Sequence, residues 1–246
     1  MPTAWYIDTV RLLCALLCAV SALADHRIEA FADFTLPLPL RPGDTLVLGI
    51  VGGWESWDTP HRAVRRTALQ LRSLHLPAVR VETVENHRME LAQELITQAF
   101  DFDKSGQLDA AEKEAARIVI YGHSLGGRAA LRFCRWLGEQ GIRVRRVVII
   151  DSYGRDSYTV PPNVAVAANL YQRDFGAIKG APKIAAEDPL QTKILGNWRY
   201  TYQGRDVDMP GEPWIRKWFM SSHLKMEYDP KPWKQVLDLL LPALSP

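Results

Sequence analysis

The sequence predicts an α/β protein whose mostly parallel sheet is covered by helices on both faces. Two observations carry this prediction. Continuous apolar runs, typical of strands buried on both sides, alternate along the chain with segments of helical periodicity. A Gly-x-Ser-x-Gly sequence also stands between one such run and the following helix. We therefore expect a single α/β domain over residues 25–246.

The strands are expected where short apolar or β-branched runs occur. The first is Leu46-Val-Leu-Gly-Ile-Val51. The others fall at residues 79–84, 118–121, 147–150 and 164–170. The stretch 172–222 is rich in Pro, Gly and Trp, so we expect irregular structure there, with one further strand near 194–202.

Helices are expected at about residues 60–74, 91–100, 125–139 and 232–241. In the second of these, Leu91, Leu95, Ile96 and Phe100 fall on one face at helical spacing. Strands that alternate with such helices form βαβ units, which require parallel strands.

Residues 1–24 have the features of a secretory signal peptide. Arg11 precedes a short apolar run, and the segment closes on Ala22-Leu23-Ala24, with small residues at the positions that a signal peptidase reads. The run is too short to span a bilayer comfortably. We expect cleavage before Asp25, export to the periplasm or the extracellular space, and no transmembrane segment in the mature chain.

The net charge and the cysteine content limit which ligands the chain binds and which disulfides it forms. A net charge of +2 argues against nucleic acid as a ligand. Cys134 is the only cysteine after residue 24, so the mature chain contains no internal disulfide.

The hexapeptide Gly122-His123-Ser124-Leu125-Gly126-Gly127 predicts a nucleophile elbow. A serine on a sharp strand-to-helix turn needs glycine two residues away on each side, because a side chain there would clash. The following helix directs free N–H groups at a developing oxyanion, and the Leu125 N–H is one expected donor. Ser124 is thus the candidate nucleophile.

This hexapeptide resembles the lipase and esterase branch of the α/β-hydrolases, and the element order is similar over residues 44–240. The resemblance implies an α/β-hydrolase fold, Ser124 as nucleophile and His123 as a supporting residue. Val51-Gly52-Gly53-Trp54-Glu55 is similar to the family's glycine-rich loop, which implies a second oxyanion donor at the N–H of Trp54 or Gly53. The first histidine of the family's fuller loop is missing here.

The family order of triad residues is serine, acid, histidine. His223 is the only histidine after Ser124, and we expect it in a loop before the last helix. Asp151, which ends the fourth strand, is the favoured acid, and Asp174, after the fifth strand, is the alternative. Glu187 and Asp188 remain further candidates.

Residues 101–112 match the twelve-residue EF-hand calcium loop position by position. Gly106 stands at the sharp turn, and helical segments flank the loop. The predicted site is structural, because the loop enters the opposite end of the strand that leads to Ser124. The oxygen ligands would come from Asp101, Asp103, Ser105, Gln107, Asp109 and Glu112.

Taken together, these features predict a serine hydrolase of the lipase or carboxylesterase type, acting on a small-molecule or lipid ester and stabilised by Ca²⁺. No organic cofactor is expected. Two alternatives stay open at this point: a hydrolase-fold protein that binds without turnover, and a thioesterase or peptidase on the same fold.

Overall fold

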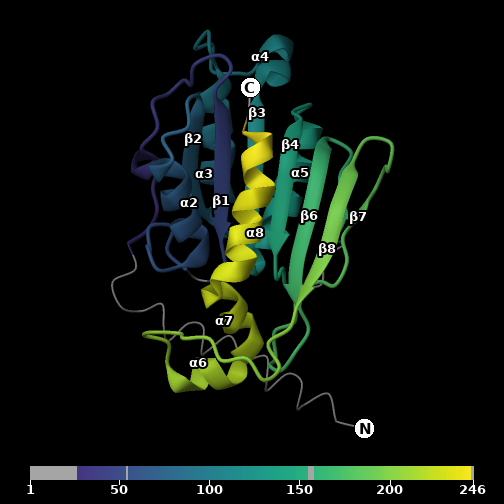
Figure 1. Cartoon of the computed structure of the whole chain (residues 1–246). Helices are drawn as coiled ribbons and strands as arrows, with labels where there is room; N and C mark the ends of the chain where they lie inside the picture. The colour runs from purple at the N-terminus through teal and green to yellow at the C-terminus, as the bar shows by residue number, and fades with distance from the viewer. Residues whose placement is uncertain (1–26, 54, 155–157, 245–246) are drawn as a thin grey trace, which may run out of the picture.

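Six parallel strands form the centre of the molecule, in the order β2-β1-β3-β4-β6-β8 (Figure 1). The computed structural model describes residues 27–53, 55–154 and 158–244. Every pair of neighbouring strands in this sheet is parallel. The strands are β1 (Thr45–Val51), β2 (Val79–Glu85), β3 (Arg117–His123), β4 (Val144–Ile150), β6 (Val164–Gln172) and β8 (Lys193–Tyr200).

The central strands are apolar because both of their faces are covered. All seven residues of β1 are buried, and Leu48 of β1 pairs in register with Ile120 of β3. β8, at the edge, is only half-buried, and a β-bulge interrupts its pairing with β6 near Ala167. Its mixed polarity fits an edge position, where one side of the strand has no partner.

Helices cover both faces of the sheet. α3 (Met89–Phe100) and α5 (Leu125–Glu139) pack with the strands in one apolar core, which includes the buried Cys134. α2 (Ala63–Ser73) and α8 (Pro230–Leu240) pack with the strands in a second core. α8 lies across the front of the sheet in Figure 1. The expected α/β class, with a mostly parallel sheet between two helical layers, is therefore confirmed.

Shorter elements complete the chain. A 3₁₀ helix, Phe31–Asp33, precedes β1, and α4 (Ala110–Ala115) precedes β3. β5 (Thr159–Val160) and β7 (Ala185–Ala186) form a separate two-stranded sheet. A second 3₁₀ helix, Leu241–Ala243, follows α8. Within the described ranges, no helix is both long and apolar enough to cross a membrane.

The segment before α8 differs from its prediction. α6 (Trp214–Phe219) and α7 (Ser221–Tyr228) occupy its end, so the expectation that His223 lies in a loop is wrong. α7 ends where Asp229 caps the next helix, with its side chain accepting from Lys231 N–H and Pro230 at the first helical position. This Asp-Pro pair splits one helical stretch into two. The predicted signal peptide lies outside the described residues.

Candidate active site

Ser124 stands on a strained turn between β3 and α5. Its φ is +57° and its ψ is −123°, a conformation that L-residues rarely adopt. The turn is fixed by a hydrogen bond from the Ser124 N–H to the Ile150 carbonyl, at 2.9 Å. The serine is 7% exposed. Such geometry places the hydroxyl at the carboxyl end of the strands.

The two glycines of the elbow are required by close backbone approaches. A Cβ on Gly126 would lie 2.1 Å from the Ile50 carbonyl oxygen, and one on Gly122 would lie 2.4 Å from the Gly126 oxygen. Both distances are far below van der Waals contact. The predicted reason for glycine at these two positions therefore matches the observed packing. Leu125, the predicted oxyanion donor, is the first residue of α5, where helical N–H groups have no intrahelical partner.

His223 and Asp151 meet in the buried interior of the site. Nδ1 of His223 lies 2.6 Å from Oδ2 of Asp151, and the two residues are 2% and 0% exposed. The ring of His123, the neighbour of Ser124 in the chain, stacks on His223 with centroids 4.8 Å apart. The stack places the His223 ring beside the elbow. Among the described residues, the Ser124 hydroxyl makes no hydrogen bond, which is common before substrate binds.

The carboxylate of Asp151 is held in place by residues that the sequence did not reveal. Asp151 directly follows β4, with a positive φ of 43°. Gln172 donates to it twice, from its backbone N–H at 3.0 Å and from Nε2 at 2.9 Å. A Cβ on Gly180 would lie 2.0 Å from Oδ1, so the loop after β6 also closes over the carboxylate. No sequence pattern marks Gln172 or Gly180 as supports.

The other acidic candidates contact different partners. Asp174 accepts from Arg199 at 3.0 Å and from the Tyr202 N–H at 2.5 Å. Burial acts to raise the pKa of Asp174, but these hydrogen bonds and the Arg199 charge outweigh it and lower the pKa. Glu187 pairs with Arg135, and Asp188 accepts from the Leu190 N–H. The structure thus brings Asp151, and none of these three, into contact with His223.

The glycine-rich loop after β1 passes directly beside the nucleophile. A Cβ on Gly52 would lie 3.0 Å from the Cβ of Ser124. Gly53 has a φ of +50°, and its carbonyl accepts from the side chain of Asn86. The other candidate donor, Trp54, lies outside the described residues. We refer to residues 52–55, where the second oxyanion donor is predicted, as the oxyanion loop.

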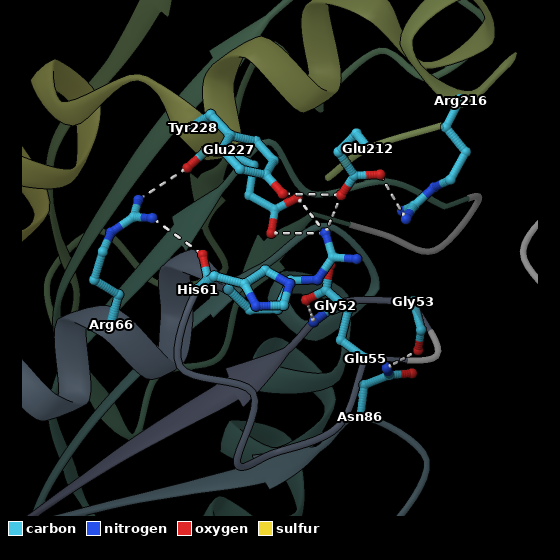
Figure 2. A network of polar contacts seen from close by, with 11 residues as sticks. Gly52, Gly53, Glu55, His61, Arg66, Asn86, Glu212, Arg216, Glu227 and Tyr228 are labelled. Carbon is cyan, nitrogen blue, oxygen red and sulfur yellow. Dashed lines mark hydrogen bonds and ion pairs between the residues drawn. The ribbon is translucent and has the colours of Figure 1, made fainter. Parts of the chain in front are cut away.

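A buried network of charged side chains joins this loop to α7 (Figure 2). Glu55, at the end of the loop, accepts from the Gly52 N–H at 3.2 Å and lies 3.7 Å from the guanidinium of Arg62. The same Arg62 nitrogen is 2.8 Å from Glu212 and 3.4 Å from Glu227. These residues come from distant parts of the sequence, so no local pattern predicted the network.

Two groups here have displaced pKa values. Burial, reinforced by Glu227, raises the pKa of Glu55 to about 8, although Arg62 acts to lower it. Burial and the neighbouring His223 hold the pKa of His123 well below its usual value, so its ring is neutral. His123 therefore brings no charge to the site.

The predicted calcium loop connects α3 to α4, at the amino end of β3 and away from Ser124. Asp101 accepts from the N–H groups of Ser105 and Gly106 at 2.9 and 2.8 Å. Glu112 turns inward and accepts from the N–H groups of Phe102 and Asp109. Carboxylate oxygens of three residues lie within 4.8 Å of one another: Asp101, Asp103 and Glu112.

The remaining predicted ligands are close to these carboxylates. The Ser105 hydroxyl donates to the carbonyl of Gln107 at 2.8 Å, so both oxygens lie in the loop. Asp109 caps α4 by accepting from the Glu112 N–H. Hydrogen bonds from Ser105 lower the pKa of the Asp103 carboxyl. The predicted oxygen ligands therefore lie close together within the loop of residues 101–112.

Comparisons with known proteins found no matching family model and no matching curated protein. Among solved structures, the chain is similar to the RedJ thioesterase of the prodiginine biosynthetic pathway in Streptomyces coelicolor. The two are 14% identical, with a TM-score of 0.38, over 92% of this chain and 94% of that one. A second RedJ structure, with a PEG molecule bound in its active site, is 13% identical, with a TM-score of 0.36, over 85% and 99%. At these low values, neither likeness carries an argument about this chain.

Proposed function

We propose that the protein is a serine hydrolase of the lipase or carboxylesterase type. The observation that carries the proposal is the buried contact of His223 Nδ1 with Asp151, beside a serine on a strained strand-to-helix turn. In a triad, the acid holds the imidazole so that its other nitrogen faces the nucleophile. Asp151 occupies Nδ1, which leaves Nε2 of His223 for Ser124.

The reaction would proceed through an acyl-enzyme. Ser124 Oγ attacks the ester carbonyl carbon while His223 takes the hydroxyl proton. The oxyanion accepts from the N–H of Leu125 and from one N–H of the oxyanion loop, at Gly53 or Trp54. His223 then gives its proton to the leaving alcohol. Water, activated by the same histidine, releases the acyl group.

Exposed aromatic side chains beside α7 favour an apolar ester. Trp214 and Trp218 are 76% and 63% exposed on α6, which contacts α7. Phe175 is 67% exposed, and its carbonyl accepts from the Ser222 N–H, one residue before His223. Exposed apolar groups next to a site commonly contact ligand. A thioester or an amide would use the same residues, so an acyl-chain and leaving-group panel decides among these substrates.

We further propose that residues 101–112 bind Ca²⁺ and stabilise the fold. The gathered oxygen donors are the hard ligands that Ca²⁺ prefers. A cation bound only to the native state raises stability by mass action. Since the loop and Ser124 are at opposite ends of β3, the ion would take no part in the chemistry.

Export is proposed from residues 1–24 alone. Expression of the full chain with fractionation tests it. A mature N-terminus at Asp25 in the periplasm or medium is expected, and an intact N-terminus in the cytoplasm would contradict it.

Fluorophosphonate labelling of residues 25–246, read by intact mass and peptide mapping, tests the hydrolase proposal without a guess at substrate. One adduct on Ser124, lost in His223→Ala, is expected. Folded protein that takes up no adduct would instead favour a protein that binds a ligand without turnover.

A further inference from the structure

The carboxyl groups of Glu55 and Glu227 form a close pair inside the protein. Oxygens of both lie within 4.8 Å of each other and of a ring nitrogen of His123. The side chain of Glu55 is 12% exposed and that of Glu227 is 3% exposed. Nε2 of His123 is buried and has no hydrogen-bond partner among the described residues. Two ionised carboxylates at this separation would repel each other strongly, because little water is present to screen them.

Among the side chains in direct ion-pair contact, the charges do not cancel if every group is ionised. Three carboxylates, Glu55, Glu212 and Glu227, face two guanidinium groups, Arg62 and Arg216. His123 from β3 and Tyr228, which donates to Glu212 at 3.0 Å, are neutral. Arg66 donates to the backbone carbonyl of Glu227 at 3.2 Å (Figure 2). One negative charge is therefore in excess. A buried excess charge is normally removed by a proton or a bound cation.

A metal ion is the less favourable way to remove this charge. Arg62 already contacts Glu55, Glu212 and Glu227, so a cation between the carboxylates would stand against its guanidinium. A proton on one of the two carboxyl groups brings no such repulsion.

We propose that the pair formed by Glu55 and Glu227 carries one proton in total, and that this pair, together with Arg62, holds the oxyanion loop against the helix that carries His223. Glu55 is then a positioning residue: it acts on the loop through the Gly52 N–H and does not touch substrate. Glu227 lies one helical turn after His223 on α7. The pair thus joins the oxyanion donor to the base. This inference rests on the proposed hydrolase function.

Loss of this proton would weaken the contact between the oxyanion loop and α7. Two negative charges would then face each other across the gap, and the loop would move away from α7. Displacement of an oxyanion donor removes stabilisation of the transition state, whereas substrate binding stays largely unchanged. The effect is therefore expected in kcat rather than in KM. The pKa of Glu55, raised to about 8 by burial and by Glu227, sets where this happens.

The decisive experiment is the pH profile of kcat, from pH 6 to 10, for the wild type, Glu55→Gln and Glu227→Gln. Glutamine reproduces the shape of a protonated glutamate and cannot ionise. In the wild type, kcat should fall about tenfold per pH unit above pH 8, the slope for loss of one proton. Both variants should lose this alkaline decline, whatever their activity near pH 7. A decline that persists in either variant would overturn the proposal.

A thermal-stability series separates this inference from the hydrolase proposal. The folded-state pKa of Glu55 is above its unfolded value, so the native state is progressively destabilised relative to the unfolded state as pH rises from about 4.5 to about 8. The Tm advantage of Glu55→Gln over the wild type should therefore grow across this window, even if no substrate is ever found. A constant Tm difference would refute the proton on this pair. If the protein is inactive but this Tm difference still grows with pH, only the hydrolase proposal is refuted.

Glu29→Gln is the matched control. Glu29 is a buried carboxyl outside the Arg62 network, which accepts from the Glu85 N–H, and burial likewise raises its pKa to about 8. Its substitution should change the pH dependence of Tm in the same direction and leave the alkaline decline of kcat in place. If Glu29→Gln abolished the decline, the assignment to Glu55 would be wrong.

Discussion

Nδ1 of His223 lies 2.6 Å from Oδ2 of Asp151, although 72 residues separate them in the chain. The contact links the end of β4 to α7, and Gln172 at the end of β6 supports the carboxylate. Of the two aspartates that the sequence offered, the favoured Asp151 contacts His223, whereas Asp174 contacts Arg199. The catalytic role of Asp151 is the first prediction to test.

Asp151→Asn should lower kcat by roughly 10³- to 10⁴-fold, because an amide favours the wrong imidazole tautomer. Steady-state kinetics on an ester, or the rate of fluorophosphonate labelling, measures the loss. Asp174→Asn is the matched comparison and should cost far less activity, since its carboxylate pairs with Arg199 and does not contact His223. A greater loss in Asp174→Asn than in Asp151→Asn would reverse the assignment.

Removal of Ca²⁺ should lower the Tm of the wild type while the rate of fluorophosphonate labelling of Ser124, measured below the Tm, stays constant. Thermal melts with and without a chelator measure the first effect. Asp101→Asn combined with Glu112→Gln removes two of the gathered carboxylates and should abolish the difference made by the chelator. A chelator response that survives in this variant would show that the ion binds elsewhere.

Gly126→Ala should destabilise the fold or prevent it, because its new Cβ would lie 2.1 Å from the Ile50 carbonyl. Overpacking of this kind costs about 1–3 kcal/mol or more. Urea unfolding provides the measurement. Gly138→Ala, in the same helix, would meet only the side chain of Asn163, at 3.0 Å, and is the control. Equal losses in the two variants would argue against a backbone clash at the elbow.

Stability should decline as pH rises from about 4.5 to about 8, in part because of Glu29. Burial raises the pKa of this carboxyl to about 8, although the hydrogen bond from the Glu85 N–H acts to lower it. The unfolded chain therefore releases a proton that the folded chain keeps, which favours unfolding across this window. Glu29→Gln should show a smaller decline in urea midpoint between pH 5 and 8. An identical decline in both proteins would remove Glu29 as a cause.

The sequence predicted those parts of the molecule that depend on local pattern. β1 and β3 are continuously apolar, and α5 was expected at its observed bounds because the Gly-rich elbow marks its start. β8 was placed within two residues at its ends, although its mixed polarity gives a weak signal. The parallel pairing and the helical cover on both faces then follow from βαβ connections.

What the sequence did not predict depends on contacts between distant segments. Glu55, Arg62, Glu212 and Glu227 are ordinary charged residues in the sequence, and only the fold makes them a buried network. His223 was expected in a loop because α7 is a short helix whose periodicity is weak. Polar networks of this kind have no characteristic spacing of residues along the sequence, whereas strands and helices do.

Cys134 has a practical consequence for all of these measurements. It is the only cysteine among the described residues, it is fully buried on α5, and burial raises the pKa of its thiol. A thiol-reactive probe therefore modifies it only when α5 separates from the sheet. The modification rate then measures how fast the helix that follows Ser124 opens. Measurement of this rate needs neither substrate nor ion. The rate therefore distinguishes a variant that has lost catalytic activity from one whose native state unfolds faster.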